Sequence, residues 1–186
     1  MTQNAPNDRL LRALATAFVE HPRATLKDLA EAAGTSKATL HRLCGTRENL
    51  VKMLDDHGLA ALNQVIRDSD LEQAEPRAAL KRLIHGHLTH REMLVFMMFQ
   101  YRPDSFDQGC GGENWRPYVE ALDAFFLRGQ RAGLFRIDIS APVLTELFNA
   151  LLYGIVDAER RGRAASASSA AVFEEFFLHG SAGLEK

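Results

Sequence analysis

Residues 32–50 have the sequence AAGTSKATLHRLCGTRENL. It contains two glycines, each followed closely by a hydroxyl residue, and it has no carboxylate between Gly34 and Arg47. Glycine ends helices because it adopts left-handed backbone conformations, and Ser or Thr begins them because its side-chain oxygen accepts from free backbone N–H groups. The stretch therefore predicts a short helix from Ser36 to Cys44, with one helix ending before it and another starting after it.

The predicted short helix has two different faces. At about 100° per residue, the apolar Leu40, Leu43 and Cys44 share one arc and face inward. The opposite arc carries cationic, hydroxylated and small residues: Lys37, Ala38, Thr39, His41 and Arg42. Phosphates attract Lys and Arg, and a small residue at the centre lets a helix approach base edges in the major groove. This face is typical of a helix that reads duplex DNA.

A second short helix precedes it. Thr25 is a predicted N-cap, and Asp28 follows at the spacing of a capping box. Two short helices joined by the turn GTS, the second one presenting polar residues, indicate a helix-turn-helix that binds DNA. The same pattern also fits a solvent-exposed cationic face on an ordinary helical bundle, so spacing and charge alone leave both interpretations open.

Helical periodicity continues along the rest of the chain, and no segment shows the sustained alternation of a strand. Turn signals occur at Pro76, near Thr89 and in the glycine-rich stretch DSFDQGCGGEN, residues 104–114. We therefore predict an all-α protein. It has an N-terminal three-helix DNA-binding head with the helix-turn-helix in residues 1–55 and a larger C-terminal helical domain for ligand binding and dimerisation in residues 56–186.

Composition limits the classes of partner. The net charge of −2 means that an anionic partner must meet a local cationic patch, and 46% hydrophobic with 25% charged residues is typical of globular proteins. Two cysteines, Cys44 and Cys110, suit a reducing compartment. The polar N-terminus lacks the apolar core of a signal peptide, and no apolar run approaches the roughly 18 residues of a membrane span. We expect a cytoplasmic protein without a membrane partner.

The segment TLKDLAEAAGTSKATLHRLCGTRENL, residues 25–50, resembles the DNA-binding segment of the tetracycline-repressor (TetR-like) family of bacterial transcriptional regulators. The matching residues are Thr25, Leu29-Ala30, Ala33-Gly34, Ser36, Thr39-Leu40, Glu48 and Leu50. The resemblance covers roughly residues 8–55. The remainder is similar to the family in its length, its helix order and the AGLFR turn before two C-terminal helices.

The resemblance implies a set of DNA contacts. Thr25, His41 and Arg47 would contact phosphates, and the residues nearest the bases would be Lys37, Ala38, Thr39 and Arg42. Ser36 lies beside the N-terminus of the short helix, where free N–H groups favour anions.

Two residues depart from the family pattern. His41 replaces a usual Tyr, and because a protonated imidazole binds phosphate better, we expect tighter DNA binding at lower pH. Cys44 replaces a usual Phe, and its apolar arc favours a small core residue over a redox sensor.

The two predicted C-terminal helices carry more apolar surface than one core can use. We interpret this surface as a homodimer interface formed by Leu151, Leu152, Ile155, Phe173, Phe176 and Phe177. Helix-turn-helix regulators generally dimerise to span half-sites about 34 Å apart, and two such helices with their symmetry mates form a four-helix interface. The alternative is that both helices complete the core of one chain.

The middle of the chain offers a candidate cavity for a small-molecule effector. Its predicted lining is His87, Arg91, Met98, Trp115, Tyr118 and Phe125. Methionine and aromatic side chains with a few polar groups are typical of such pockets, and the resemblance implies an inducer that changes the spacing of the DNA-reading helices. The same residues also fit a packed core, in which His87 and Arg91 form a structural pair.

No pattern of metal, cofactor or catalytic chemistry is evident. HGHLTH, residues 85–90, does not place its three imidazoles on one helical face, and no cysteine or carboxylate completes a ligand set. The chain has no catalytic-triad order, phosphate loop or nucleotide fingerprint. We therefore expect no metal, no cofactor and no enzymatic activity.

These observations predict a homodimeric transcriptional regulator, a repressor that a small-molecule effector releases from double-stranded operator DNA. The competing interpretation is a small-molecule-binding or helical scaffold protein whose helix-turn-helix is vestigial.

Overall fold

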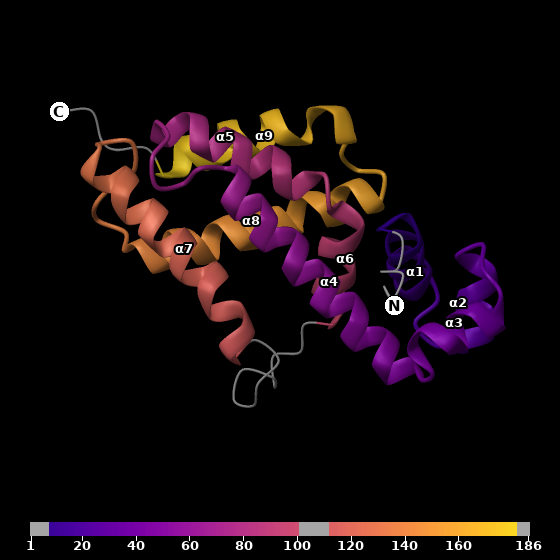
Figure 1. Cartoon of the computed structure of the whole chain (residues 1–186). Helices are drawn as coiled ribbons and strands as arrows, with labels where there is room; N and C mark the ends of the chain where they lie inside the picture. The colour runs from indigo at the N-terminus through magenta and orange to yellow at the C-terminus, as the bar shows by residue number, and fades with distance from the viewer. Residues whose placement is uncertain (1–7, 101–111, 182–186) are drawn as a thin grey trace. The chain divides into compact units, whose positions relative to one another are not determined.

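The computed structural model describes residues 8–100 and 112–181, and the elements in these ranges are α-helices (Figure 1). Their bounds are α1 (Asp8–Glu20), α2 (Leu26–Ala32), α3 (Lys37–Cys44), α4 (Arg47–Asp68), α5 (Pro76–Leu88), α6 (Arg91–Gln100), α7 (Gly112–Arg131), α8 (Ala141–Arg160) and α9 (Ser166–Ser181). The all-α prediction and the break near Thr89 are confirmed.

The glycine-rich stretch is only partly a loop. Residues 104–111, which include Cys110, lie outside the described residues, whereas residues 112–114 form the first turn of α7. The prediction of a loop up to residue 114 was therefore wrong at its C-terminal end.

The helices form two compact units. Unit 1 is Met1–Ala60 with Arg91–Tyr101, and unit 2 is Ala61–His90 with Arg102–Lys186. Unit 1 thus contains α1, α2, α3, α6 and the first part of α4. The rest of α4 belongs to unit 2, together with α5, α7, α8 and α9. The domain boundary after residue 55 stays a prediction.

Side-chain caps and glycines delimit the short helices of unit 1. Thr25 Oγ1 accepts from the Asp28 N–H at 3.3 Å, and the Asp28 carboxylate accepts from the Thr25 N–H at 2.9 Å, which is the predicted capping box. Ser36 Oγ accepts from the Thr39 N–H at 3.1 Å. Gly34 and Gly45 have φ values of +70° and +74°, which L-residues rarely adopt, and they end α2 and α3.

The core of unit 1 joins α1 to the helix-turn-helix and to α6. Leu29 of α2, Leu40 of α3 and Leu50 of α4 are fully buried with apolar residues of α1. Phe18 of α1 packs edge-to-face on Phe96 of α6, with 5.4 Å between ring centroids. These buried side chains attach α2 and α3 to a common apolar core.

The core of unit 2 is a cluster of phenylalanine rings from α7, α8, α9 and the α7–α8 turn. Its members are Phe125, Phe126, Phe135, Phe148, Phe173 and Phe177. The ring centroids of neighbours lie 5.1 to 6.3 Å apart in mostly edge-to-face geometry, which adds quadrupolar attraction to apolar burial.

The turn between α4 and α5 is held by two arginines. The Arg82 guanidinium donates twice to the Ser69 carbonyl, and Arg128 donates to the carbonyls of Leu71 and Ala74, both at 2.8 Å. These bonds satisfy carbonyl groups that follow the C-terminal end of α4.

Replacing Gly129 with Ala tests the packing of unit 2. A Cβ there would lie 2.3 Å from Cδ2 of Phe135, so we expect the free energy of unfolding to fall by about 1–3 kcal/mol. Gly180→Ala is the control, because nothing lies within 4 Å of that site in α9 and alanine favours a helix. Urea unfolding at a fixed protein concentration measures both. Equal midpoints for Gly129→Ala and the unmodified protein would contradict this packing.

Candidate nucleic-acid interface

The outward face of α3 presents cationic and small side chains to solvent. Lys37, Ala38, His41 and Arg42 are exposed, and Thr39 is half-buried. Because the inward Leu40 is fully buried, α3 cannot turn this face away without exposing an apolar side chain. The structure therefore places the five predicted residues of this helix on one accessible surface.

The C-terminal end of α3 is fixed by local hydrogen bonds. The Cys44 thiol donates to the Leu40 carbonyl at 3.2 Å, and the Asn49 amide donates to the Cys44 carbonyl at 2.9 Å. Burial raises the pKa of the Cys44 thiol, which disfavours the reactive thiolate. Cys44 is thus a buried, hydrogen-bonded residue of the head.

Hydroxyl groups surround the N-terminal end of α3. Ser36 Oγ and Thr39 Oγ1 lie 2.9 Å apart, and Ser36 Oγ also accepts from the Thr39 N–H. One of the two hydroxyls donates its proton to the other oxygen. The second hydroxyl therefore keeps a free proton that it can donate to a phosphate oxygen.

The cations of α3 have no ion-pair partner within the described residues. The acidic residues of α2 are engaged on their own helix, where Glu31 lies 3.8 Å from Lys27 and Asp28 is part of the capping box. Hydrogen bonds from Thr25 hold the pKa of Asp28 below its usual value. Lys37 and Arg42 are therefore available to phosphates or bases.

Two predicted phosphate contacts already have intramolecular partners. The Thr25 hydroxyl donates to Asp28 Oδ2 at 2.8 Å, so it would have to leave the capping box to bind a phosphate. Arg47 is half-buried, donates to the Pro22 carbonyl at 2.6 Å and stacks on the Phe18 ring. The sequence pattern gave no sign of these Arg47 partners, which lie 25 and 29 residues away in the chain.

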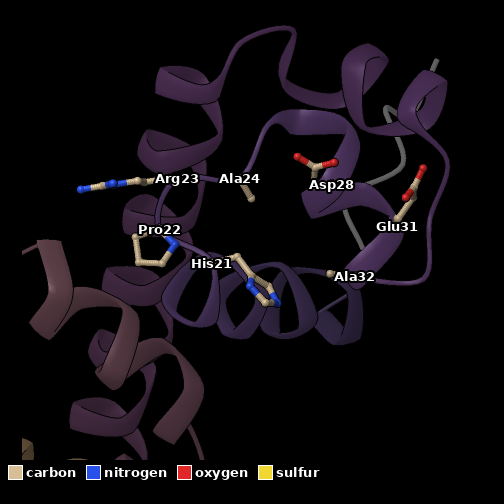
Figure 2. Close-up of a pocket in the computed structure, with 7 residues that line it drawn as sticks. All are labelled: His21, Pro22, Arg23, Ala24, Asp28, Glu31 and Ala32. Atoms are coloured by element: carbon tan, nitrogen blue, oxygen red, sulfur yellow. The ribbon is translucent and has the colours of Figure 1, made fainter.

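A shallow depression lies beside the turn between α1 and α2 (Figure 2). It is lined by His21, Pro22, Arg23, Ala24, Asp28, Glu31 and Ala32. The carboxylates of Asp28 and Glu31 point from α2, and the Arg23 side chain extends away from them. α3 contributes no residue to this lining, so the depression is not part of the α3 surface. No sequence motif marked it.

The predicted effector residues divide between the two units. Arg91 and Met98 belong to unit 1 and are half-buried, whereas His87, Trp115, Tyr118 and Phe125 belong to unit 2. Within unit 2, Trp115 is half-buried and packs edge-to-face on Tyr118 at 5.5 Å between centroids, and Phe125 lies in the phenylalanine core.

His87 is fully buried with both ring nitrogens engaged. Nδ1 lies 2.8 Å from the Leu83 carbonyl oxygen, so it carries a proton, and Nε2 lies 2.8 Å from the Tyr118 hydroxyl. Burial lowers the pKa of His87 to about 4, so the ring is neutral at pH 7 and Nε2 accepts from Tyr118. The Tyr118 hydroxyl also lies 3.2 Å from Asn149 Oδ1. These contacts agree with the alternative that His87 is a structural core residue, but its two ring nitrogens bind Leu83 and Tyr118 and not the Arg91 of the predicted pair.

The predicted dimer residues fall into two groups. Leu152, Phe173 and Phe177 are buried in the core of unit 2, so they present no surface to a second chain. Leu151 and Ile155 are half-buried, and Phe176 is exposed. Further exposed apolar residues of α8 and α9 are Val143, Leu147 and Val172.

Within the described ranges, 8–100 and 112–181, no group of three or more His, Cys, Asp or Glu side chains could hold a metal ion. α8 is long and apolar enough to cross a membrane, but a core helix of a globular protein meets the same criterion, and six α8 residues are buried within unit 2.

Sequence comparison finds relatives among transcriptional regulators. Residues 8–61 match the IclR helix-turn-helix domain, a family model that covers the head alone. The HTH-type transcriptional regulator NfxB of Pseudomonas aeruginosa is 66% identical over 180 residues, which cover 97% of this chain and 96% of NfxB. The HTH-type transcriptional repressor LfrR of Mycolicibacterium smegmatis is 30% identical over 91 residues, about half of each chain.

Structural comparison finds the TetR-like fold. LfrR in complex with proflavine matches with a TM-score of 0.73 and 23% identity, over 92% of this chain and 93% of LfrR. The TetR family regulator PfmR from Thermus thermophilus matches with a TM-score of 0.71 and 24% identity, over 96% of this chain and all of PfmR. The predicted likeness to TetR-like regulators is confirmed for the fold of the whole chain, beyond the head.

The buried His87 makes the stability of the protein depend on pH. Burial lowers its pKa from 6.5 to about 4, so between these values the unfolded chain binds a proton that the folded chain does not. Stability therefore falls as pH drops from 6.5 to 4, by about 3 kcal/mol in total. Gln cannot take up this proton, so we expect His87→Gln to show a shallower loss of stability across this range.

Thermal unfolding at several pH values measures the difference, and His85→Gln, an exposed histidine of the same helix, is the control. Burial raises the pKa of Asp55 to about 6, which acts with the opposite sign but equally in all three proteins. If the stability of His87→Gln fell with decreasing pH as steeply as that of His85→Gln, the His87 ring would not be buried in its neutral form.

Proposed function

Because the chain belongs to the family of helix-turn-helix transcriptional regulators that includes NfxB, and because it has the TetR-like fold, we propose that it is a homodimeric repressor. A small molecule that binds to unit 2 releases it from double-stranded operator DNA. The protein works in the cytoplasm, where that DNA lies, and catalyses no reaction.

The accessible face of α3 is the observation that carries the DNA-binding part of the proposal. Lys37 and Arg42 are exposed and unpaired within the described residues, and Ala38 between them is small enough to let the helix approach base edges. We assign base contacts to Lys37, Ala38, Thr39 and Arg42, and phosphate contacts to Ser36 and His41.

The apolar surface of α8 and α9 supports pairing with a second copy. Val143 and Leu147 are 47% and 49% exposed, and Leu151 and Ile155 continue the same row at four-residue spacing along α8. On α9, Val172 and Phe176 are 52% and 68% exposed and also four residues apart. Rows of exposed apolar residues on two long helices are typical of an isologous dimer interface.

Unit 2 supplies the proposed effector site. Trp115, Tyr118 and Asn149 combine aromatic surface with hydrogen-bonding groups, which is typical of sites for small molecules. Proflavine is bound by the neighbour LfrR, and for this chain we propose an effector with aromatic character. Such a ligand releases the DNA only if it binds more tightly to a dimer whose heads no longer fit the operator.

One observation favours the competing function. Thr25 and Arg47, which would contact phosphates by the family pattern, are engaged within the head. A small-molecule-binding or scaffold protein with a vestigial helix-turn-helix would tolerate this engagement. The two functions are distinguished by whether the cations of α3 determine DNA affinity.

We expect the double variant Lys37→Ala with Arg42→Ala to bind DNA about 100-fold more weakly, because it removes two contacts that are each worth about 1–3 kcal/mol. The probe is a duplex that the unmodified protein selects from a random library, and fluorescence anisotropy measures affinity. The control, Arg131→Ala with Arg163→Ala, removes two exposed cations from unit 2. If both double variants bind equally well, the α3 surface does not bind DNA and the scaffold function is favoured.

We expect Phe176→Glu to convert the dimer to a monomer, because it places a charge in an apolar interface. Sedimentation velocity measures the state of association. Ile137→Glu is the matched control, since Ile137 is 84% exposed but lies in the α7–α8 turn. If Phe176→Glu sediments as a dimer, or if Ile137→Glu dissociates, the interface does not lie on α8 and α9.

A further inference from the structure

Arg47 links the start of α4 to the end of α1. Arg47 is the first residue of α4 and follows α3 by only two residues. Its Nη2 donates to the Pro22 carbonyl at 2.6 Å, and its Cζ lies 4.2 Å from the centroid of the Phe18 ring. One planar guanidinium thus contacts both α1 and the turn that follows α1.

The ring under Arg47 is itself held in place. Phe18 is 5% exposed, and its ring packs edge-to-face on Phe96 of α6 with an interplanar angle of 81°. Within unit 1, the contacts therefore run from α6 through the Phe18 ring to the guanidinium at the start of α4. Arg47 stacks on a fixed ring.

The orientation of α3 depends on the helices at its two ends. α3 has eight residues, and the turn after it contains Gly45 at φ +74°. The Asn49 amide of α4 donates to the Cys44 carbonyl at the end of α3. Because the first turn of α4 holds the end of α3, fixing α4 on α1 also fixes the direction in which α3 presents its outward face.

We propose that Arg47 is a positioning residue for DNA reading, which clamps the start of α4 onto Phe18 and Pro22 and so aligns α3 with the bases. It acts through α3, and its guanidinium does not bind a phosphate. The inference rests on the proposed DNA reading by α3, and it replaces the phosphate contact that the family pattern implies for this position.

The clamp needs an arginine. A guanidinium is planar, so it can stack on a ring by one face while an edge N–H donates to a carbonyl. A lysine ammonium is a compact charge that cannot make both contacts with the same geometry, although it binds a phosphate well. Arg47→Lys therefore separates the two roles, because it keeps the charge and loses the clamp.

The test compares specific and non-specific DNA affinity. The probes are a duplex that the unmodified protein selects from a random library and a scrambled duplex of equal length and composition. A misaligned α3 loses base contacts but keeps phosphate contacts. We therefore expect Arg47→Lys to bind the selected duplex about tenfold more weakly, with unchanged affinity for the scrambled duplex and an unchanged salt dependence.

Two further variants complete the experiment. Phe18→Leu removes the ring but not the charge, and we expect it to reproduce the loss of specific affinity. Thermal unfolding checks that this core variant is folded at the assay temperature. Arg131→Lys, an exposed arginine of unit 2, is the matched control and should bind both duplexes normally.

A phosphate contact gives the opposite results. Arg47→Lys would then bind both duplexes as the unmodified protein does, and Arg47→Ala would weaken both together and reduce the slope of log affinity against log salt by about 0.9. Either result, or normal specific affinity in Phe18→Leu, overturns the proposal. If the unmodified protein selects no duplex, the proposed function itself has failed, which is a different outcome.

Discussion

The proposed reading of DNA depends on the burial of Leu40. An eight-residue helix is marginal in water by itself, so α3 exists because its inward side chain is fully enclosed and its ends are capped by Ser36 and Asn49. The same packing leaves the opposite face without a partner among residues 8–100 and 112–181. The hydrophobic core of unit 1 therefore fixes the direction of the side chains that we propose to bind DNA, and it leaves them accessible to solvent.

The features that the sequence predicted are local ones. The capping box at Thr25, the cap at Ser36 and the helix ends at Gly34 and Gly45 each depend on residues no more than four positions apart, and the structure has all of them. The outward position of Arg42 follows from helical periodicity in the same way. Local hydrogen bonds and periodicity were enough to place the helix-turn-helix and the face of α3.

The features that the sequence did not predict need distant partners. Arg47 contacts Phe18 and the Pro22 carbonyl because the fold brings the start of α4 to the end of α1, and no local sequence pattern predicts that contact. Periodicity grouped Phe173, Phe176 and Phe177 as apolar, but it could not tell which face of α9 meets the core of its own chain. The phenylalanine cluster takes Phe173 and Phe177 and leaves Phe176 exposed. His87 illustrates the same limit, since its partner Tyr118 lies 31 residues away.

We propose that two copies of α3 read successive turns of one duplex, and hydroxyl-radical footprinting can detect this arrangement. The probe is again a duplex selected by the purified protein. We expect two protected segments of related, inverted sequence whose centres are about 10 base pairs, or a multiple of one helical turn, apart. A single protected segment, or uniform protection without a repeat, would contradict it.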